Sequence, residues 1–176
     1  MNAAPDTAVD TATGCVLFTD LVGFTEFNDT VGDRTALDVL DRQTALARSV
    51  VEQHAGARVV KELGDGLMLW FPTAEAGLRG AAEFAIAARD ARRSGFPLAV
   101  RMGLHYGECI RRGDDLIGQT VNVAARISDL AGPGELLVSE EVLEASPEAG
   151  AGLELSFVGP VSVKGVAEPV WLRRLD

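Results

Sequence analysis

The stretch of sequence that decides the fold is VVKELGDGLMLWF, residues 59–71. Two apolar, strand-like runs flank Gly64-Asp65-Gly66, a tripeptide typical of the tight turn in a β-hairpin. A tight turn joins antiparallel strands, whereas parallel strands need a long crossover connection. The stretch therefore predicts an antiparallel sheet of the α+β class rather than a doubly wound parallel sheet.

The segments on either side of this hairpin alternate between strand-like and helical patterns. A buried strand is expected over residues 15–19 and a long helix over 33–54, whose apolar stripe includes Leu37, Leu40, Ala47 and Val51. Past the hairpin, the sequence predicts helices over 74–93, 120–131 and 140–145 and strands over 136–138, 155–158 and 170–175. Residues 98–110 are expected to form one long strand or two short ones. The order strand, helix, strand, strand, helix, strand is that of a ferredoxin-like (βαββαβ) fold, an antiparallel sheet with flanking helices.

Length, charge and cysteine content limit the classes of protein that fit. The 176 residues are expected to form one domain over residues 14–176, preceded by a flexible N-terminal tail over residues 1–13. The formal net charge of -10 argues against nucleic acid or an anionic membrane as the main partner. No apolar run approaches the length of a membrane span. Cys15 and Cys109 lie in apolar runs, which predicts buried, reduced thiols and a cytoplasmic protein.

A second informative stretch is VLFTDLVGFT, residues 16–25, which places Asp20 at the end of an apolar strand. If this strand neighbours the hairpin, Asp20 and Asp65 emerge at the same edge of the sheet. The backbone N–H groups of Gly23, Phe24 and Thr25 then offer a phosphate site at the start of a helix. Together these groups predict a cage for a divalent metal and a triphosphate, although Asp65 alone is more often a simple turn residue.

Lys61 and Asp115 are candidates for base recognition. An ammonium group can donate to N1 of adenine, and a carboxylate can accept from the N6 amino group. Guanine reverses both roles, so such a pair favours ATP over GTP. The alternatives are a solvated strand lysine and a solvated turn aspartate.

The stretch DLIGQTVNVAAR, residues 115–126, places Asn122 and Arg126 on one face of a helix. Arg126 is suited to stabilising charge on a phosphoryl group, and Asn122 to positioning a ribose. The alternative is a surface asparagine and an arginine paired with Asp129. Lys164 is a further candidate for phosphate binding, and His105 is interpreted as a strand histidine with a structural hydrogen bond.

These motifs together resemble the class III adenylyl/guanylyl cyclase catalytic domain, most closely that of bacterial adenylyl cyclases. FTDLVGFT, KELGDG, DLIGQTVNVAAR and VKG occur in the order of that family, from about Gly14 to Leu175. The resemblance implies two divalent metal ions, Mg or Mn, bound by Asp20, Asp65 and the Leu21 carbonyl group. It also implies that Lys61 and Asp115 select adenine and that Asn122 and Arg126 stabilise the transition state. Lys164 is implied to bind the triphosphate.

The resemblance further implies a head-to-tail homodimer with two shared active sites. One chain is expected to supply Asp20, Asp65 and the phosphate loop, and the other to supply the remaining candidate residues. The implied reaction converts ATP to 3',5'-cyclic AMP and pyrophosphate. A guanylyl cyclase and a catalytically silent nucleotide-binding module are the alternatives.

Overall fold

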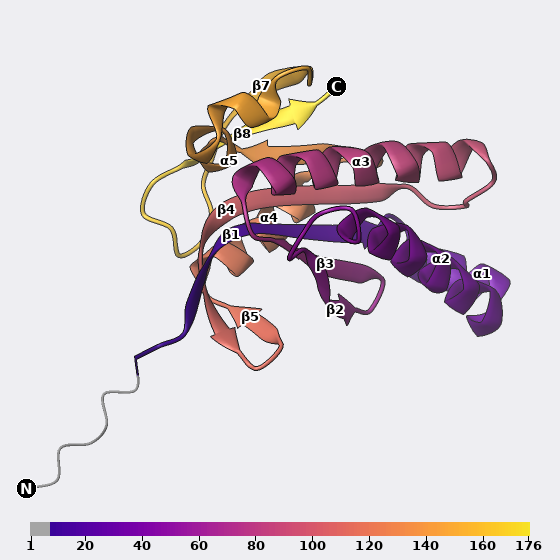
Figure 1. Cartoon of the computed structure of the whole chain (residues 1–176). Coiled ribbons are helices and arrows are strands. Elements are labelled where there is room, and N and C mark those ends of the chain that lie inside the picture. Colours follow the sequence, from indigo (N-terminus) through magenta and orange to yellow (C-terminus); the bar gives the residue numbers. More distant parts are fainter. Residues whose placement is uncertain (1–7) are drawn as a thin grey trace, which may run out of the picture.

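An eight-stranded sheet carries helices on both of its faces in the computed structural model, which describes residues 8–176 (Figure 1). The strands are β1 (Thr11–Leu21), β2 (Arg58–Leu63), β3 (Gly66–Phe71), β4 (Val100–Arg112), β5 (Asp115–Ile117), β6 (Leu136–Ser139), β7 (Leu155–Val161) and β8 (Val170–Leu175). The helices are α1 (Phe24–Val31), α2 (Asp33–Val51), α3 (Ala74–Arg93), α4 (Gln119–Leu130), α5 (Glu140–Ala145) and the 3-10 helix η1 (Pro147–Gly150).

The sheet order confirms the α+β prediction made from the hairpin. The strands lie in the order β2-β3-β1-β4-β6-β8-β7, and β5 pairs with β4 outside this row. The first four strands are antiparallel throughout, as the ferredoxin-like pattern predicts, and the pairing of β4 with β6 is the parallel one. The sheet is therefore open and mostly antiparallel.

Several boundaries differ from the sequence prediction. β1 begins at Thr11, so residues 11–13 pair with β4 instead of belonging to the expected tail, of which residues 1–7 lie outside the described part. The expected strand over 98–110 is one continuous β4 that extends to Arg112. Leu37 was placed wrongly in the apolar stripe of α2, because its side chain is 56% exposed. The predicted Ala47 and Val51 are buried, and Val39 and Val50 complete the stripe with them.

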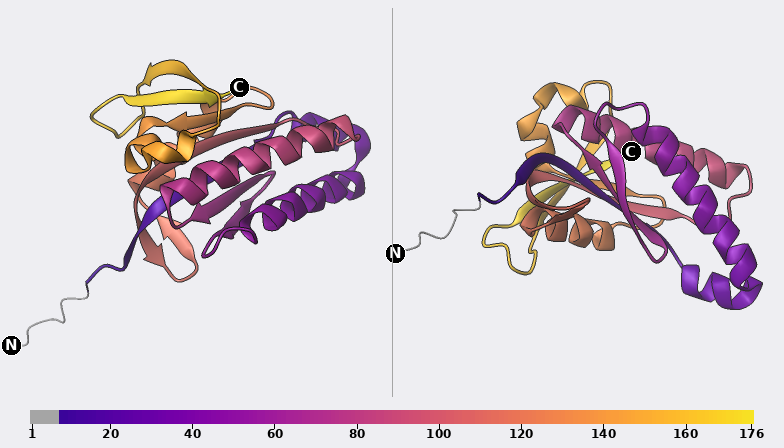
Figure 2. Two further views of the ribbon diagram at one scale, coloured as in Figure 1. Left: turned by 45° about the horizontal axis from the view of Figure 1, so that its top comes forward. Right: turned by 60° about the horizontal axis from the view of Figure 1, so that its bottom comes forward.

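The two faces of the sheet are covered by different helices (Figure 2). On β1, Cys15, Leu17 and Leu21 pack in a core cluster with residues of α2, α3 and α5. Val16 belongs to a second cluster on the opposite face, which includes Ala124 of α4. Because side chains alternate along a strand, the even-numbered residues of β1, including Asp20, face the α4 side. That alternation decides where the polar residues at the end of β1 point.

The buried polar groups of the core agree with the sequence prediction. Cys15 and Cys109 are both free and buried, and burial raises the pKa of each thiol. The buried ring of His105 lies with Nδ1 2.8 Å from the hydroxyl oxygen of Ser139, which confirms a structural hydrogen bond. Within the described part of the chain, every helix is too short or too polar to cross a bilayer.

Helix α4 packs directly on the backbone of β4 at Gly103. A Cβ atom at this position would lie 2.7 Å from Cα of Ser128 and 2.8 Å from the carbonyl oxygen of Ala124. Both atoms belong to the backbone of α4, so the whole helix would have to move. We expect Gly103→Ala to lower the free energy of unfolding by about 1–3 kcal/mol, measured by urea denaturation.

Gly132→Ala is the matched control for this prediction. A Cβ atom there meets only the flexible carboxylate of Glu135, at 3.4 Å. We expect its effect to stay within about 0.5 kcal/mol. Equal stability of the two variants would contradict the close packing of α4 on β4.

Candidate active site

The end of β1 and the β2–β3 turn bring Asp20 and Asp65 to one edge of the sheet. Asp20 lies opposite Gly66 in the β1–β3 register, directly beside the turn that carries Asp65. A side chain at Gly66 would lie 2.7 Å from the carbonyl oxygen of Thr19, so glycine permits this close approach. Burial, followed by the charge and hydrogen bonding of Asp20, raises the pKa of Asp65. Two neighbouring carboxyl groups at this edge favour a bound cation.

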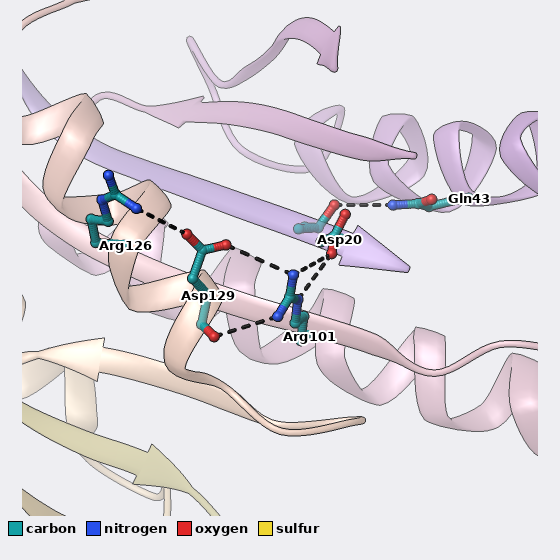
Figure 3. Close-up of polar contacts among 6 residues, drawn as sticks. Asp20, Gln43, Arg101, Arg126 and Asp129 are labelled. Carbon is teal, nitrogen blue, oxygen red and sulfur yellow. Dashed lines mark hydrogen bonds and ion pairs between the residues drawn. The ribbon is translucent and has the colours of Figure 1, made fainter. Parts of the chain in front are cut away.

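Arg101 is part of this edge and was not predicted from the sequence. Its Nη2 and Nε atoms lie 2.7 Å and 2.9 Å from Oδ2 of Asp20 (Figure 3). The two residues are direct cross-strand partners, because Asp20 of β1 lies opposite Arg101 of β4. Arg101 could have been identified only from the register of β1 and β4, which a single sequence does not reveal.

Arg101 also connects the carboxylate edge to helix α4. Its Nη2 atom lies 3.7 Å from Oδ1 of Asp129, and Oδ2 of Asp129 lies 3.8 Å from Nη1 of Arg126. Figure 3 shows the resulting row of side chains, in which Arg101 and Asp129 stand between Asp20 and Arg126. Within one chain, Asp20 and Arg126 are thus linked only through Arg101 and Asp129, and they form no ion pair with each other.

A buried hydrogen bond supports the strand end from the other face. Gln43 of α2 donates through Nε2 to the Thr19 hydroxyl oxygen at 3.1 Å, and both residues are buried. Since Thr19 precedes Asp20, this contact fixes the backbone that carries the carboxylate. A buried polar pair with both partners satisfied holds the local geometry more firmly than an exposed one.

The predicted phosphate loop follows β1 and opens helix α1. Gly23 adopts the left-handed conformation, with φ 75°, and its carbonyl oxygen accepts from the N–H of Phe27 at 3.0 Å. No side chain caps this helix, so the N–H groups of its first turn, including those of Phe24 and Thr25, remain free of a capping partner. Such an N-terminus favours an anion.

Lys61 and Asp115 form an ion pair although 54 residues separate them. Lys61 Nζ lies 2.9 Å from each carboxylate oxygen of Asp115, and both side chains are little more than one-third exposed. The hydrogen bond from Lys61 is the main cause that lowers the pKa of Asp115. The backbone N–H of Leu116 donates to the same carboxylate at 2.8 Å. Asp115 is therefore an oriented, ionised group rather than a freely solvated turn residue.

The remaining predicted residues lie on and beside α4. Asn122 and Arg126 are exposed, and Arg126 makes the ion pair with Asp129 that the sequence offered as the alternative. Arg126 and Lys164 both line a shallow hollow of about 350 Å³. Gln119 donates to the carbonyl oxygen of Gly165 at 3.0 Å, which ties the loop of Lys164 to the start of α4. The fold thus brings two cationic side chains, Arg126 and Lys164, to one surface, which they share with the Asp129 carboxylate.

The donor atoms at the carboxylate edge fit a hard divalent cation. Asp20, Asp65 and the backbone carbonyl group of Leu21 offer oxygen alone, which is the chemistry that Mg²⁺ and Mn²⁺ prefer. Among the described residues, no three His, Cys, Asp or Glu side chains form a metal cluster. An ion at this edge would therefore complete its coordination with water or phosphate oxygens, as Mg²⁺ commonly does.

The mostly antiparallel α+β sheet thus carries, at one edge, two neighbouring carboxylates, an uncapped helix N-terminus and two arginines, Arg101 and Arg126, that are linked through Asp129. The chain belongs to the adenylate and guanylate cyclase catalytic domain family, whose model matches residues 8–173. This family membership confirms the resemblance drawn from the sequence motifs.

Individual relatives agree with this assignment. A pH-sensitive adenylate cyclase of Mycobacterium tuberculosis is 34% identical over 163 residues, which cover 91% of this chain and 40% of the relative. An adenylate cyclase of Glutamicibacter nicotianae is 32% identical over 120 residues, which cover 68% of this chain and 29% of the relative. This chain thus spans less than half the length of either relative.

A solved structure shows the same fold over nearly the whole chain. The adenylate/guanylate cyclase/hydrolase from Silicibacter pomeroyi superposes with a TM-score of 0.80 at 27% sequence identity. The match covers 96% of this chain and 98% of the solved chain.

Proposed function

We propose that this domain is an adenylyl cyclase that converts ATP to 3',5'-cyclic AMP and pyrophosphate. The observation that carries the choice of ATP is the ion pair between Lys61 and Asp115, with 2.9 Å contacts. It presents a donor beside an acceptor, the pattern that complements N1 and the N6 amino group of adenine. Guanine has a donor at N1 and an acceptor at O6, so it fits this pair less well.

The reaction joins the ribose 3'-oxygen to the α-phosphorus and breaks the bond to the β-phosphate, releasing pyrophosphate. The proton of the 3'-hydroxyl group leaves to a base, for which Asp20 is the candidate. Because the attack is intramolecular, holding the substrate in an in-line pose supplies much of the rate. Asn122 would hold the ribose, and Arg126 would stabilise charge on the α-phosphoryl group.

The carboxylate edge would hold two divalent ions through Asp20, Asp65 and the carbonyl group of Leu21. Such ions lower the pKa of the attacking hydroxyl group and neutralise the triphosphate. The N–H groups that follow Gly23, together with Lys164, would bind the phosphate oxygens. Arg101 adds a guanidinium group at the same edge, where it pairs with Asp20.

A homodimer with two shared sites belongs to the same proposal. Within one chain, Arg101 and Asp129 separate the Asp20 carboxylate from the Arg126 guanidinium group. A second copy arranged head to tail would bring its own Arg126, Asn122 and Lys61 to the first chain's carboxylates. A cytoplasmic location, where ATP is abundant, completes the proposal.

One assay tests the proposal and its alternatives. Purified protein is incubated with ATP or GTP plus Mg²⁺ or Mn²⁺, and the cyclic product and pyrophosphate are quantified. We expect cyclic AMP in excess of cyclic GMP, because Lys61 and Asp115 complement adenine. A preference for GTP would indicate a guanylyl cyclase, and no product from either nucleotide would indicate a silent nucleotide-binding module.

A further inference from the structure

A β-bulge in β2 turns Arg58 and Lys61 toward the same face of the sheet. Side chains alternate along a regular strand, so residues three apart normally point in opposite directions. The register shifts after Val59, and Arg58 lies opposite Trp70 while Lys61 lies opposite Met68. Both of these partners pack in the core cluster on the α4 side. The extra residue therefore gives Arg58 and Lys61 a common direction.

Both side chains contact the turn that joins β4 to β5. Arg58 donates through Nη1 to the carbonyl oxygen of Asp114 at 2.7 Å. Lys61 binds the carboxylate of Asp115, the next residue along the chain, at 2.9 Å. Strand β2 thus makes two contacts here: Arg58 binds the backbone carbonyl group of Asp114, and Lys61 binds the side chain of Asp115.

Beyond the turn, Leu116 anchors β5, because its side chain is buried in the core cluster on the α4 side. β5 has only three residues, and among the described strands it pairs with β4 alone, outside the main row of the sheet (Figure 1). Gly113 takes the left-handed conformation, φ 61°, so the turn depends on a glycine. A short two-stranded hairpin is only marginally stable by itself. The contacts from β2 therefore add to the buried Leu116 in fixing the position of the turn.

We propose that Arg58 is a positioning residue for base recognition, an inference that rests on the proposed adenylyl cyclase function. Its hydrogen bond fixes the peptide that precedes Asp115. The carboxylate of Asp115 is thereby held beside the ammonium group of Lys61, so that both meet the adenine edge together. Arg58 itself makes no contact with the base in this arrangement.

Kinetics of Arg58→Ala test this role. We expect the ratio of kcat/KM for ATP to that for GTP to fall by about 10-fold, mainly through a higher KM for ATP. The loss of a positive charge alone would weaken the binding of ATP and of GTP equally, because both carry the same triphosphate. The ratio therefore separates positioning of Asp115 from general electrostatic attraction. Arg58→Lys keeps one donor and should recover part of the preference.

Arg92→Ala is the matched control. Arg92 also donates through Nη1 to a backbone carbonyl oxygen, that of Pro97, at 3.1 Å, but it lies at the end of α3. We expect the nucleotide ratio of this variant to stay within about twofold of wild type. An unchanged ratio in Arg58→Ala, or an equal fall in Arg92→Ala, would overturn the inference.

Amide hydrogen exchange distinguishes failure of this inference from failure of the proposed function. The N–H of Leu116 donates to the Asp115 carboxylate, so its exchange reports whether that carboxylate is held. We expect exchange at Leu116 to become about 10-fold faster in Arg58→Ala. Unchanged exchange refutes the positioning role even if the wild-type enzyme prefers ATP. A wild-type protein that makes no cyclic product refutes the proposed function, while faster exchange would still support the positioning role.

Discussion

Replacing Asp20 with alanine is expected to reduce formation of the cyclic product by at least about 100-fold. The substitution removes one of the two carboxylates at the edge of the sheet and leaves Arg101 near Asp65 with only the longer ion pair to Asp129. A guanidinium group next to the remaining carboxylate repels a divalent cation. The variant is compared with wild type by steady-state product formation over a range of Mg²⁺ and Mn²⁺ concentrations.

The fold should survive this change, because a partly exposed ion pair contributes only about 0–1 kcal/mol to stability. The matched control is Asp10→Ala, since Asp10 pairs with Arg111 at 3.6 Å near the other end of the β1–β4 ladder. We expect that variant to keep its activity within about twofold. Asp20→Asn preserves the shape but not the charge, and it should be as inactive as the alanine variant. Retained turnover in a folded Asp20→Ala protein would remove Asp20 from the metal site.

Local sequence signals were sufficient for the hairpin and for the strand that ends at Asp20, and the order of elements indicated the fold of the first four strands. Gly64-Asp65-Gly66 specifies a tight turn, and the apolar run before Asp20 specifies a buried strand. The prediction that Asp20 and Asp65 meet was conditional on the two strands being neighbours, and the β1–β3 register meets that condition, because it places Asp20 opposite Gly66. Antiparallel pairing thus follows from turn chemistry, which is a local property.

The contacts that the sequence did not reveal depend on long-range register. Arg101 meets Asp20 only because β4 pairs with β1 over 11 residue pairs, from Thr11–Ile110 to Leu21–Val100. The role of Arg58 depends on a one-residue bulge, and nothing in its neighbouring residues marks it. The exposure of Leu37 has a similar cause, because the buried stripe of α2 is set by its crossing with the sheet and α3. Helical spacing alone does not give that crossing.

The final prediction concerns two inactive chains that restore activity to each other. Asp65→Ala and Arg126→Ala homodimers should each lose at least about 100-fold in activity, because every site in them lacks one essential group. A heterodimer of the two has one site that lacks both groups and one site that lacks neither. Purified through a different tag on each chain, it should regain about half the wild-type rate, one site of two.

The matched control pairs Asp65→Ala with Asp20→Ala, two substitutions in the same half of the proposed site. Each site of that heterodimer receives one damaged carboxylate edge, so its activity should stay at the level of the parent variants. Recovery in this control would indicate contamination by wild-type chains. If the Asp65→Ala and Arg126→Ala chains form a heterodimer that stays inactive, each chain must use its own Arg126. The row formed by Asp20, Arg101, Asp129 and Arg126 would then lie within a single active site, because no second copy would be needed to complete it.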